Sequence, residues 1–154
     1  MEIADMLTPE AVVAPVRVQS KKRLFQEIAA AAAVRFNLDE ASVLSILLDR
    51  ESLGPTGVGR GVAIPHGRID GLSQVRGLFF RLDAPIGFDA VDRKPVDIVF
   101  VLLAPQDAGA EHLKALARVS RLLRSEDVCI KLRSTQDAQA IFAILTAEET
   151  SQAA

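Results

Sequence analysis

The spacing of apolar residues predicts helices in both halves of the chain. Between Lys21 and Phe36, apolar side chains recur every three or four residues behind a candidate N-cap at Ser20, as a helix that buries one face requires. A second helix is expected from Asp39, as its cap, to about Leu53. The same spacing predicts further helices over 107–124, 127–133 and 137–145.

Strand patterns alternate with these helices. The valine-rich segment 12–18 contains Pro15, which cannot donate to a ladder, so it is expected at a sheet edge. Residues 96–104 are almost all apolar, which is typical of a central strand covered on both faces. Further strands are expected over 62–66, just before a turn, and over 77–82, followed by a loop over 85–95. The order of elements predicts an α/β fold with a mixed β-sheet flanked by helices on both faces.

Length and composition are consistent with one domain. The 154 residues are 49% hydrophobic and 25% charged, and a chain of this size folds without a disulfide or structural metal. We expect a single domain over 1–154 with its core at about 3–147. At the start, residues 3–8 form a short amphipathic turn that Pro9 ends, and the tail 148–154 is expected to fray.

Charge and rare residues exclude several functional classes. The net charge is −2, which disfavours nucleic acid as a partner. The longest apolar runs, 28–34 and 98–104, are far shorter than the ~20 residues of a membrane-spanning helix, so no membrane insertion is expected. One cysteine, Cys129, excludes an internal disulfide and favours a reducing compartment, so we expect a cytoplasmic protein in which Cys129 is a packing residue. No cofactor is expected.

A glycine-rich segment, Gly54–Gly61, allows two interpretations. It is a near miss to a nucleotide-binding P-loop, but Arg60 and Gly61 stand where that motif needs lysine and Ser/Thr, and a helix precedes it where a P-loop needs a strand. The segment is therefore either a tight turn that leads into a strand or a backbone that surrounds an anion with N–H groups.

Three side chains near this segment are candidates for chemistry. His66 lies between Pro65 and Gly67 at the expected end of a strand, where it is either a reacting group or a turn histidine without a role. His112 is expected near the buried edge of its helix. Arg50 ends a helix just before the glycines, as an anion-binding or a solvated guanidinium. The two histidines lack a third ligand, so no metal site is expected.

Together these residues resemble a known family. Arg50-Glu51, followed by the segment 55–67 with its Gly-Val-Ala-Ile-Pro-His-Gly ending, looks like the phosphorylation-site signature of fructose/mannitol-type enzyme IIA domains of the bacterial phosphotransferase system. The similarity continues through 84–92, 95–105 and 111–116 and covers roughly residues 3–147. The branch it most resembles is the nitrogen-related enzyme IIA.

The resemblance implies a fold, a chemistry and a set of partners. The fold is the mixed-sheet α/β sandwich of the family. His66 would accept a phosphoryl group on Nε2 from phosphohistidine of a carrier protein, NPr or HPr. Arg50 matches the arginine that neutralises this group, and His112 matches a second active-site histidine that donates to it. Further phosphoryl-binding support is implied at Thr56, Gly57, Val58 and Gly59.

The nitrogen-related branch implies a stand-alone regulatory phosphocarrier. Family members of this branch act on potassium transport, on sensor kinases and on the enzyme that makes and degrades (p)ppGpp. The alternative is a sugar-transport enzyme IIA that passes phosphate to a IIB domain, although the chain contains no fused IIB, IIC or HPr domain. A hydrolase or metalloprotein that uses the two histidines, and a binding module without covalent chemistry, also remain open.

Overall fold

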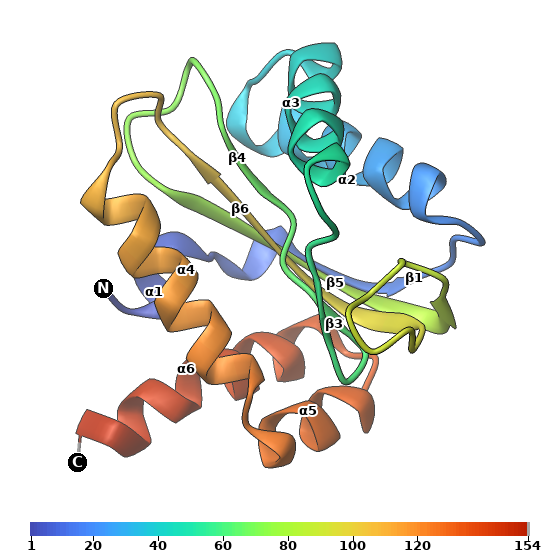
Figure 1. Cartoon of the computed structure of the whole chain (residues 1–154). Helices are drawn as coiled ribbons and strands as arrows, with labels where there is room; N and C mark the ends of the chain where they lie inside the picture. Colours follow the sequence, from blue (N-terminus) through green and yellow to red (C-terminus); the bar gives the residue numbers. More distant parts are fainter. Residues whose placement is uncertain (154) are drawn as a thin grey trace.

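A computed structural model describes the backbone of residues 1–153 and the side chains of residues 1–147, and its mixed sheet separates two groups of helices (Figure 1). On one face lie α2 (Lys21–Phe36) and α3 (Glu40–Ser52). The other face carries α4 (Ala110–Leu123), α5 (Glu126–Arg133), α6 (Ala138–Ala153) and the short α1 (Ile3–Met6). The predicted α/β fold with helices on both faces is therefore confirmed.

The sheet is built around the strand β6 (Val96–Ala104). Its order is β1-β5-β6-β3-β2, and β4 also pairs with β6. β5 is antiparallel to β6, whereas β3 and β4 both run parallel to it. The remaining strands are β1 (Val12–Val16), β2 (Gly57–Gly59), β3 (Val62–Ala63), β4 (His66–Arg68) and β5 (Arg76–Ile86).

The predicted central and edge strands are confirmed. Every β6 residue except Asp97 is buried, because helices cover both faces of this part of the sheet. β1, which contains Pro15, lies at the sheet edge and pairs with β5 alone. A proline is tolerated there because the outer side of the strand has no ladder to complete.

The capping residues also act as the sequence predicts. The Ser20 side chain accepts from the N–H of Arg23 at the start of α2, and the Asp39 side chain accepts from the N–H of Ser42 at the start of α3. Each side chain satisfies a backbone donor that the first helical turn leaves without a partner. Cys129 is 4% exposed and its thiol donates to the carbonyl of Leu123, in agreement with a packing role.

Several predicted boundaries are wrong. β1 ends at Val16 instead of residue 18, and α4 begins at Ala110 instead of residue 107. β5 continues to Ile86, because Ile86 still pairs with Val96 beyond an irregularity in the ladder, so the loop predicted over 85–95 begins at Gly87. α6 continues past residue 145 to Ala153. The frayed tail expected over 148–154 falls outside the residues whose side chains are described.

The glycine-rich segment forms a small hairpin, so the interpretation as a tight turn that leads into a strand is confirmed, whereas strand β2 before the turn was not predicted. β2 and β3 pair antiparallel around a two-residue turn at Arg60 and Gly61. Both turn residues have positive φ, 59° and 80°, as tight hairpin turns require. Arg60 occupies a conformation that side chains with a Cβ rarely adopt, so its own contacts must hold it there.

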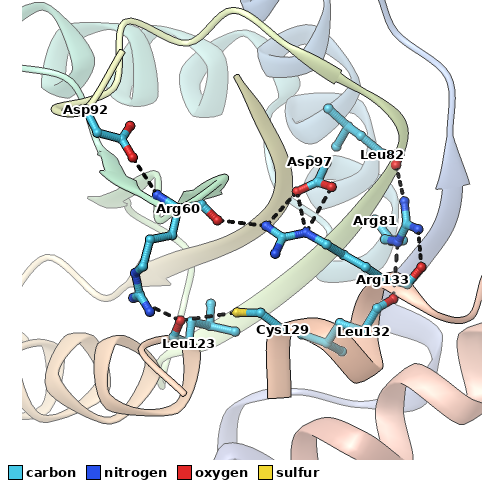
Figure 2. A network of polar contacts seen from close by, with 9 residues as sticks. All are labelled: Arg60, Arg81, Leu82, Asp92, Asp97, Leu123, Cys129, Leu132 and Arg133. Carbon is cyan, nitrogen blue, oxygen red and sulfur yellow. Dashed lines mark hydrogen bonds and ion pairs between the residues drawn. The ribbon is translucent and has the colours of Figure 1, made fainter. Parts of the chain in front are cut away.

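Arg60 is held from three sides (Figure 2). Its backbone N–H donates to Asp92, 2.9 Å away, and its backbone carbonyl accepts from Arg133 at 2.8 Å. Its guanidinium donates to the carbonyls of Leu123 and Arg124 at the end of α4. A cation is favourable there because the last carbonyls of a helix lack partners. The hairpin is thereby joined to the C-terminal end of α4.

Two further arginines complete this corner of the molecule (Figure 2). Arg133 makes a two-pronged ion pair with Asp97, with nitrogen–oxygen distances of 3.0–3.1 Å. Arg81 donates to the carbonyls of Leu132 and Arg133 at the end of α5 and to that of Leu82. These contacts fasten α5 to β5 and β6. No helix among the described residues is long and apolar enough to cross a membrane.

The Arg133–Asp97 pair should contribute measurably to stability. The Asp97 side chain is 14% exposed, so Arg133→Met leaves a largely buried carboxylate without its partner. We expect the free energy of unfolding in urea to fall by about 2–3 kcal/mol. The control is Arg17→Met, because Arg17 is 86% exposed in its pair with Asp83, and its loss should stay below about 0.5 kcal/mol. Equal losses would contradict this account.

Candidate functional site

The site lies at an interruption between two short strands, β3 and β4, that pair with the same neighbour. β3 and β4 both pair with β6, but Ile64 and Pro65 between them belong to neither strand. Pro65 has no N–H for the ladder, although its carbonyl accepts from Leu102 at 3.0 Å. The N–H of Ile64 instead donates to the carbonyl of Thr56 at 3.0 Å. The predicted strand over 62–66 is therefore broken, and His66 begins a strand instead of ending one.

The interruption fixes the orientation of the His66 ring. Nδ1 lies 2.8 Å from the carbonyl oxygen of Ile64. A carbonyl only accepts, so Nδ1 carries the proton in this contact. In a neutral ring, Nε2 then has a free lone pair. His66 is half-buried. Because Nδ1 is bound to the Ile64 carbonyl, Nε2 is the ring nitrogen available for chemistry.

Arg50 places a cation at this second nitrogen. It lies in the last turn of α3, and its Nε donates to His66 Nε2 at 3.3 Å. Its Nη1 donates to the carbonyl of Gly54 at 3.0 Å, which restrains the guanidinium. α3 approaches β4 closely, because a Cβ on Gly67 would lie 2.6 Å from Ile46 Cγ2. A glycine is needed there so that the helix reaches His66.

His112 packs against the His66 ring from α4, on the opposite face of the sheet from α3 (Figure 1). It is the third residue of α4, and its ring stands edge-on to that of His66 at 5.7 Å between centroids. The residue is 7% exposed, and its Nε2 is buried without a hydrogen-bond partner among the described residues. A buried polar atom without a partner is costly, and this one belongs to a ring that packs against the ring of His66.

Both histidines favour the neutral form at pH 7. Burial lowers the pKa of His66 below its usual 6.5 and Arg50 lowers it further, whereas the Ile64 hydrogen bond and Glu51 oppose the change. Burial also lowers the pKa of His112, and the charges of His66 and Arg68 act in the same direction. A neutral imidazole is the nucleophilic form.

The other predicted site residues lie differently. The hydroxyl and the N–H of Thr56 both donate to the Glu51 carboxylate, so its donors are already in use. Gly57 packs against Ala90, and Gly59 lies against Asp92. Among residues 1–147, no hydrogen bond joins Gly57, Val58 or Gly59 to His66, and the glycine segment forms a hairpin.

Sequence reasoning missed Lys21 as a neighbour of this site. Its Nζ lies 2.9 Å from the carboxylate of Glu51 and donates to the carbonyl of Phe88 at 3.1 Å. Because Lys21 starts a helix more than twenty residues before the motif, no local pattern connected it to Glu51. Among the described residues, no three side chains of the metal-binding types gather as a metal site.

The arrangement suits transfer of an anionic group. A neutral imidazole with one free nitrogen is a nucleophile, and a guanidinium at that nitrogen stabilises negative charge on an incoming group. A buried ring nitrogen without a partner is available to bind one more oxygen. Such a site fits a phosphoryl group, which carries several acceptor oxygens.

Comparisons with known proteins agree with this chemistry. A family model described as "Phosphoenolpyruvate-dependent sugar phosphotransferase system, EIIA 2" matches residues 5–148. A nitrogen regulatory protein of Bradyrhizobium diazoefficiens is 54% identical over 145 residues, covering 94% of this chain and 95% of that protein.

Two solved structures share the fold. The crystal structure of nitrogen regulatory protein IIA-Ntr from Neisseria meningitidis has a TM-score of 0.88 at 41% identity, covering 94% of this chain and 99% of that one. Enzyme IIA for mannitol of Escherichia coli, solved in complex with phosphorylated enzyme IIB, has a TM-score of 0.78 at 18% identity over 92% and 99% of the two chains. The second likeness shows the fold alone.

The contacts of the two histidines predict separable titrations. In an NMR pH titration, both should titrate below 6.5. Arg50→Met should raise the pKa of His66, because it removes a nearby positive charge. Arg68→Met is the matched control and should raise the pKa of His112 instead. A His66 pKa that does not move in Arg50→Met would contradict the contact between Arg50 and Nε2.

Proposed function

Because the chain belongs to the EIIA type-2 family of the phosphoenolpyruvate-dependent sugar phosphotransferase system, we propose that His66 Nε2 is the phosphoryl acceptor of a cytoplasmic phosphocarrier. The donor is phosphohistidine on a carrier protein of the NPr or HPr type. The observation that carries the proposal is the contact between His66 Nδ1–H and the Ile64 carbonyl. It leaves Nε2 unprotonated and therefore nucleophilic at neutral pH.

The transfer step needs no base. The lone pair of His66 Nε2 forms a bond to phosphorus while the bond from phosphorus to the donor imidazole breaks, and the donor nitrogen keeps that electron pair. His66 retains its proton on Nδ1 throughout. The product ring carries positive charge, which strengthens its hydrogen bond to the Ile64 carbonyl. Since both partners are histidines, the protein supplies position and charge stabilisation more than driving force.

Two neighbours stabilise the group in transit. Arg50, now bound to Nε2, turns its guanidinium to the phosphoryl oxygens when they occupy that position. His112 supplies a donor, because its buried Nε2 has no other partner among the described residues. Thr56 is not a direct phosphoryl donor in this proposal, since its N–H and hydroxyl are bound to the Glu51 carboxylate.

The regulatory branch is the better-supported role. Proteins named as nitrogen regulatory align over nearly the whole chain at 54% and 41% identity, whereas the mannitol enzyme IIA shares only 18%. We therefore propose that phosphorylation of His66 decides which regulatory proteins the chain binds. Potassium transport systems, sensor kinases and (p)ppGpp enzymes are the classes to test.

Phosphate uptake tests the acceptor. With phosphoenolpyruvate, enzyme I and the NPr or HPr carrier, the protein should take up one phosphoryl group in an acid-labile, alkali-stable linkage. His66→Ala should take up none, because the proposal gives His112 the part of a donor to the phosphoryl group and not of its acceptor. His112→Ala is the matched control and should still be phosphorylated, more slowly. Phosphate on the His66→Ala variant would refute the assignment.

Arg50 should control the rate of transfer without controlling the fold. Arg50→Ala removes the cation from Nε2, and we expect transfer from the carrier to slow by roughly 10²-fold, the range seen when one stabilising donor of a transition state is lost. Arg50→Lys should fall between, because lysine keeps the charge but not the planar fork. Single-turnover transfer in a quench-flow instrument measures both, with urea unfolding as a check on stability. An unchanged rate would exclude this role.

Sugar dependence separates the two branches. A sugar-transport enzyme IIA passes its phosphoryl group to a IIB domain, so the phosphorylated protein would lose phosphate rapidly when membranes with a fructose or mannitol permease and the sugar are added. For a regulatory phosphocarrier, we expect the phosphate on His66 to persist in that mixture. The readout is the labelled protein that remains on an alkaline gel.

A further inference from the structure

A buried carboxylate next to the site has no part in the transfer step described above. The side chain of Glu51 is 7% exposed. Its oxygens accept from the N–H of Thr56 at 2.8 and 3.2 Å, from the hydroxyl of Thr56 and from Lys21 Nζ at 2.9 Å. A buried charge is costly unless it is paired and fully hydrogen-bonded. This one is fully bonded, and its partners show which segment it holds.

A line of hydrogen bonds leads from Glu51 to the His66 ring. Thr56 donates its N–H to Glu51, and its carbonyl accepts the N–H of Ile64 at 3.0 Å. The carbonyl of Ile64 accepts Nδ1–H of His66 at 2.8 Å. At each step the donor lies on the His66 side and the acceptor on the Glu51 side. The three bonds therefore fix the backbone of Thr56 and Ile64 in relation to the His66 ring.

We propose that Glu51, acting through Thr56 and Ile64, is a positioning residue that holds His66 in the tautomer with Nε2 free. This inference rests on the proposed function, because a fixed tautomer matters only if Nε2 is the acceptor. Glu51 touches neither the ring nor the incoming group. Its effect passes through the backbone contact between Thr56 and Ile64, which places the carbonyl opposite Nδ1.

The same loop also restrains the other side of the ring. Gly54, whose carbonyl accepts from Arg50 Nη1 at 3.0 Å, lies two residues before Thr56. Arg50 and Glu51 are neighbours on α3, and consecutive side chains of a helix point in different directions. Arg50 therefore reaches Nε2 of His66, while Glu51 holds the loop at Thr56. The same loop contains Gly54, whose carbonyl restrains the Arg50 guanidinium.

Lys21 offsets the cost of burying the Glu51 carboxylate by pairing with it, and it links this carboxylate to a second helix, α2. Its ammonium lies 4.5 Å from the centroid of the Phe88 ring and donates to the Phe88 carbonyl as well as to Glu51. Phe88 in turn packs where a Cβ on Gly57 would come within 3.2 Å of it. α2, α3 and the start of the hairpin thus meet at one carboxylate.

The decisive experiment reads the tautomer directly. In ¹⁵N NMR of the ring nitrogens at pH 7.5, the wild-type protein should show His66 protonated at Nδ1 alone. In Glu51→Gln, the loop loses its charged acceptor, and we expect a mixture of both tautomers. Phosphoryl transfer from the carrier should slow by roughly tenfold, the scale of a small misplacement of a reacting group. A His66 that stays wholly in the Nδ1–H form in Glu51→Gln overturns the proposal, whatever the transfer rate.

Further variants separate positioning from stability. Asp39→Ala removes the N-cap of the same helix at its far end and costs about 1 kcal/mol, so it should lower stability while leaving the His66 tautomer unchanged. If Glu51→Gln does not fold, Thr56→Val removes only one donor to the carboxylate and should give a smaller mixture, which Thr56→Ser restores. A pure Nδ1–H tautomer in Thr56→Val would then overturn the proposal.

The two proposals fail in distinguishable ways. The tautomer measurement needs no phosphate, so it tests Glu51 even if the wild-type protein accepts no phosphoryl group. Absence of uptake by the wild-type protein would refute the phosphocarrier function alone. Normal uptake together with an unaltered tautomer in the variants would refute the role of Glu51 alone.

Discussion

The position of one carbonyl governs the chemistry of this site. The Ile64 carbonyl oxygen accepts the hydrogen bond from Nδ1 of His66. It lies within reach of the ring because the pairing along β6 is interrupted at Ile64 and Pro65, between β3 and β4. In an unbroken strand, the backbone carbonyl of residue 64 would bond within the ladder. The imidazole would then lack the acceptor that fixes its tautomer. Proline enforces the break, since it cannot donate to a ladder. Burial then keeps the ring neutral, and Arg50 meets the nitrogen that remains.

The rest of the fold brings three separate chain segments together at the His66 ring. Arg50 comes from the end of α3, His66 from the start of β4 and His112 from the first turn of α4, and the two helices lie on opposite faces of the sheet. Their relative placement depends on contacts remote from the rings. The close approach at Gly67 sets α3, and Arg60 ties the hairpin that leads to His66 to the far end of α4 (Figure 2). Rigid helices transmit such restraints along their length.

The sequence supports prediction of the site's members better than of its geometry. Helices with clear caps and the apolar strand 96–104 have signals that are local in the chain, and they form as predicted. The glycines at 57–61 are a local signal for a tight turn, but the pairing of the hairpin at Gly57–Ala63 has none, because Arg60 adopts its positive φ through contacts with Asp92, Arg133 and the end of α4, all distant in sequence. The meeting of His66, Arg50 and His112 was suggested by resemblance alone, and the structure shows the contacts. Lys21 and the bonding of Thr56 to Glu51 required the structure, since a buried ion pair between two helices leaves no pattern in either.

Charge balance at the site explains how one group could change what the protein binds. Glu51 is matched by Lys21, and among residues 1–147 no ion pair joins Arg50 or Arg68, which lie next to the two histidines, to a carboxylate. A phosphoryl group on His66 would itself carry about −1.5 to −2 charges at pH 7, partly offset by the positive charge of the ring that keeps its proton on Nδ1. Phosphorylation of His66, as proposed, would therefore make the charge next to Arg50 and Arg68 less positive. A partner that carries carboxylates against this surface would discriminate between the two states through electrostatics, and this discrimination would weaken as the salt concentration rises.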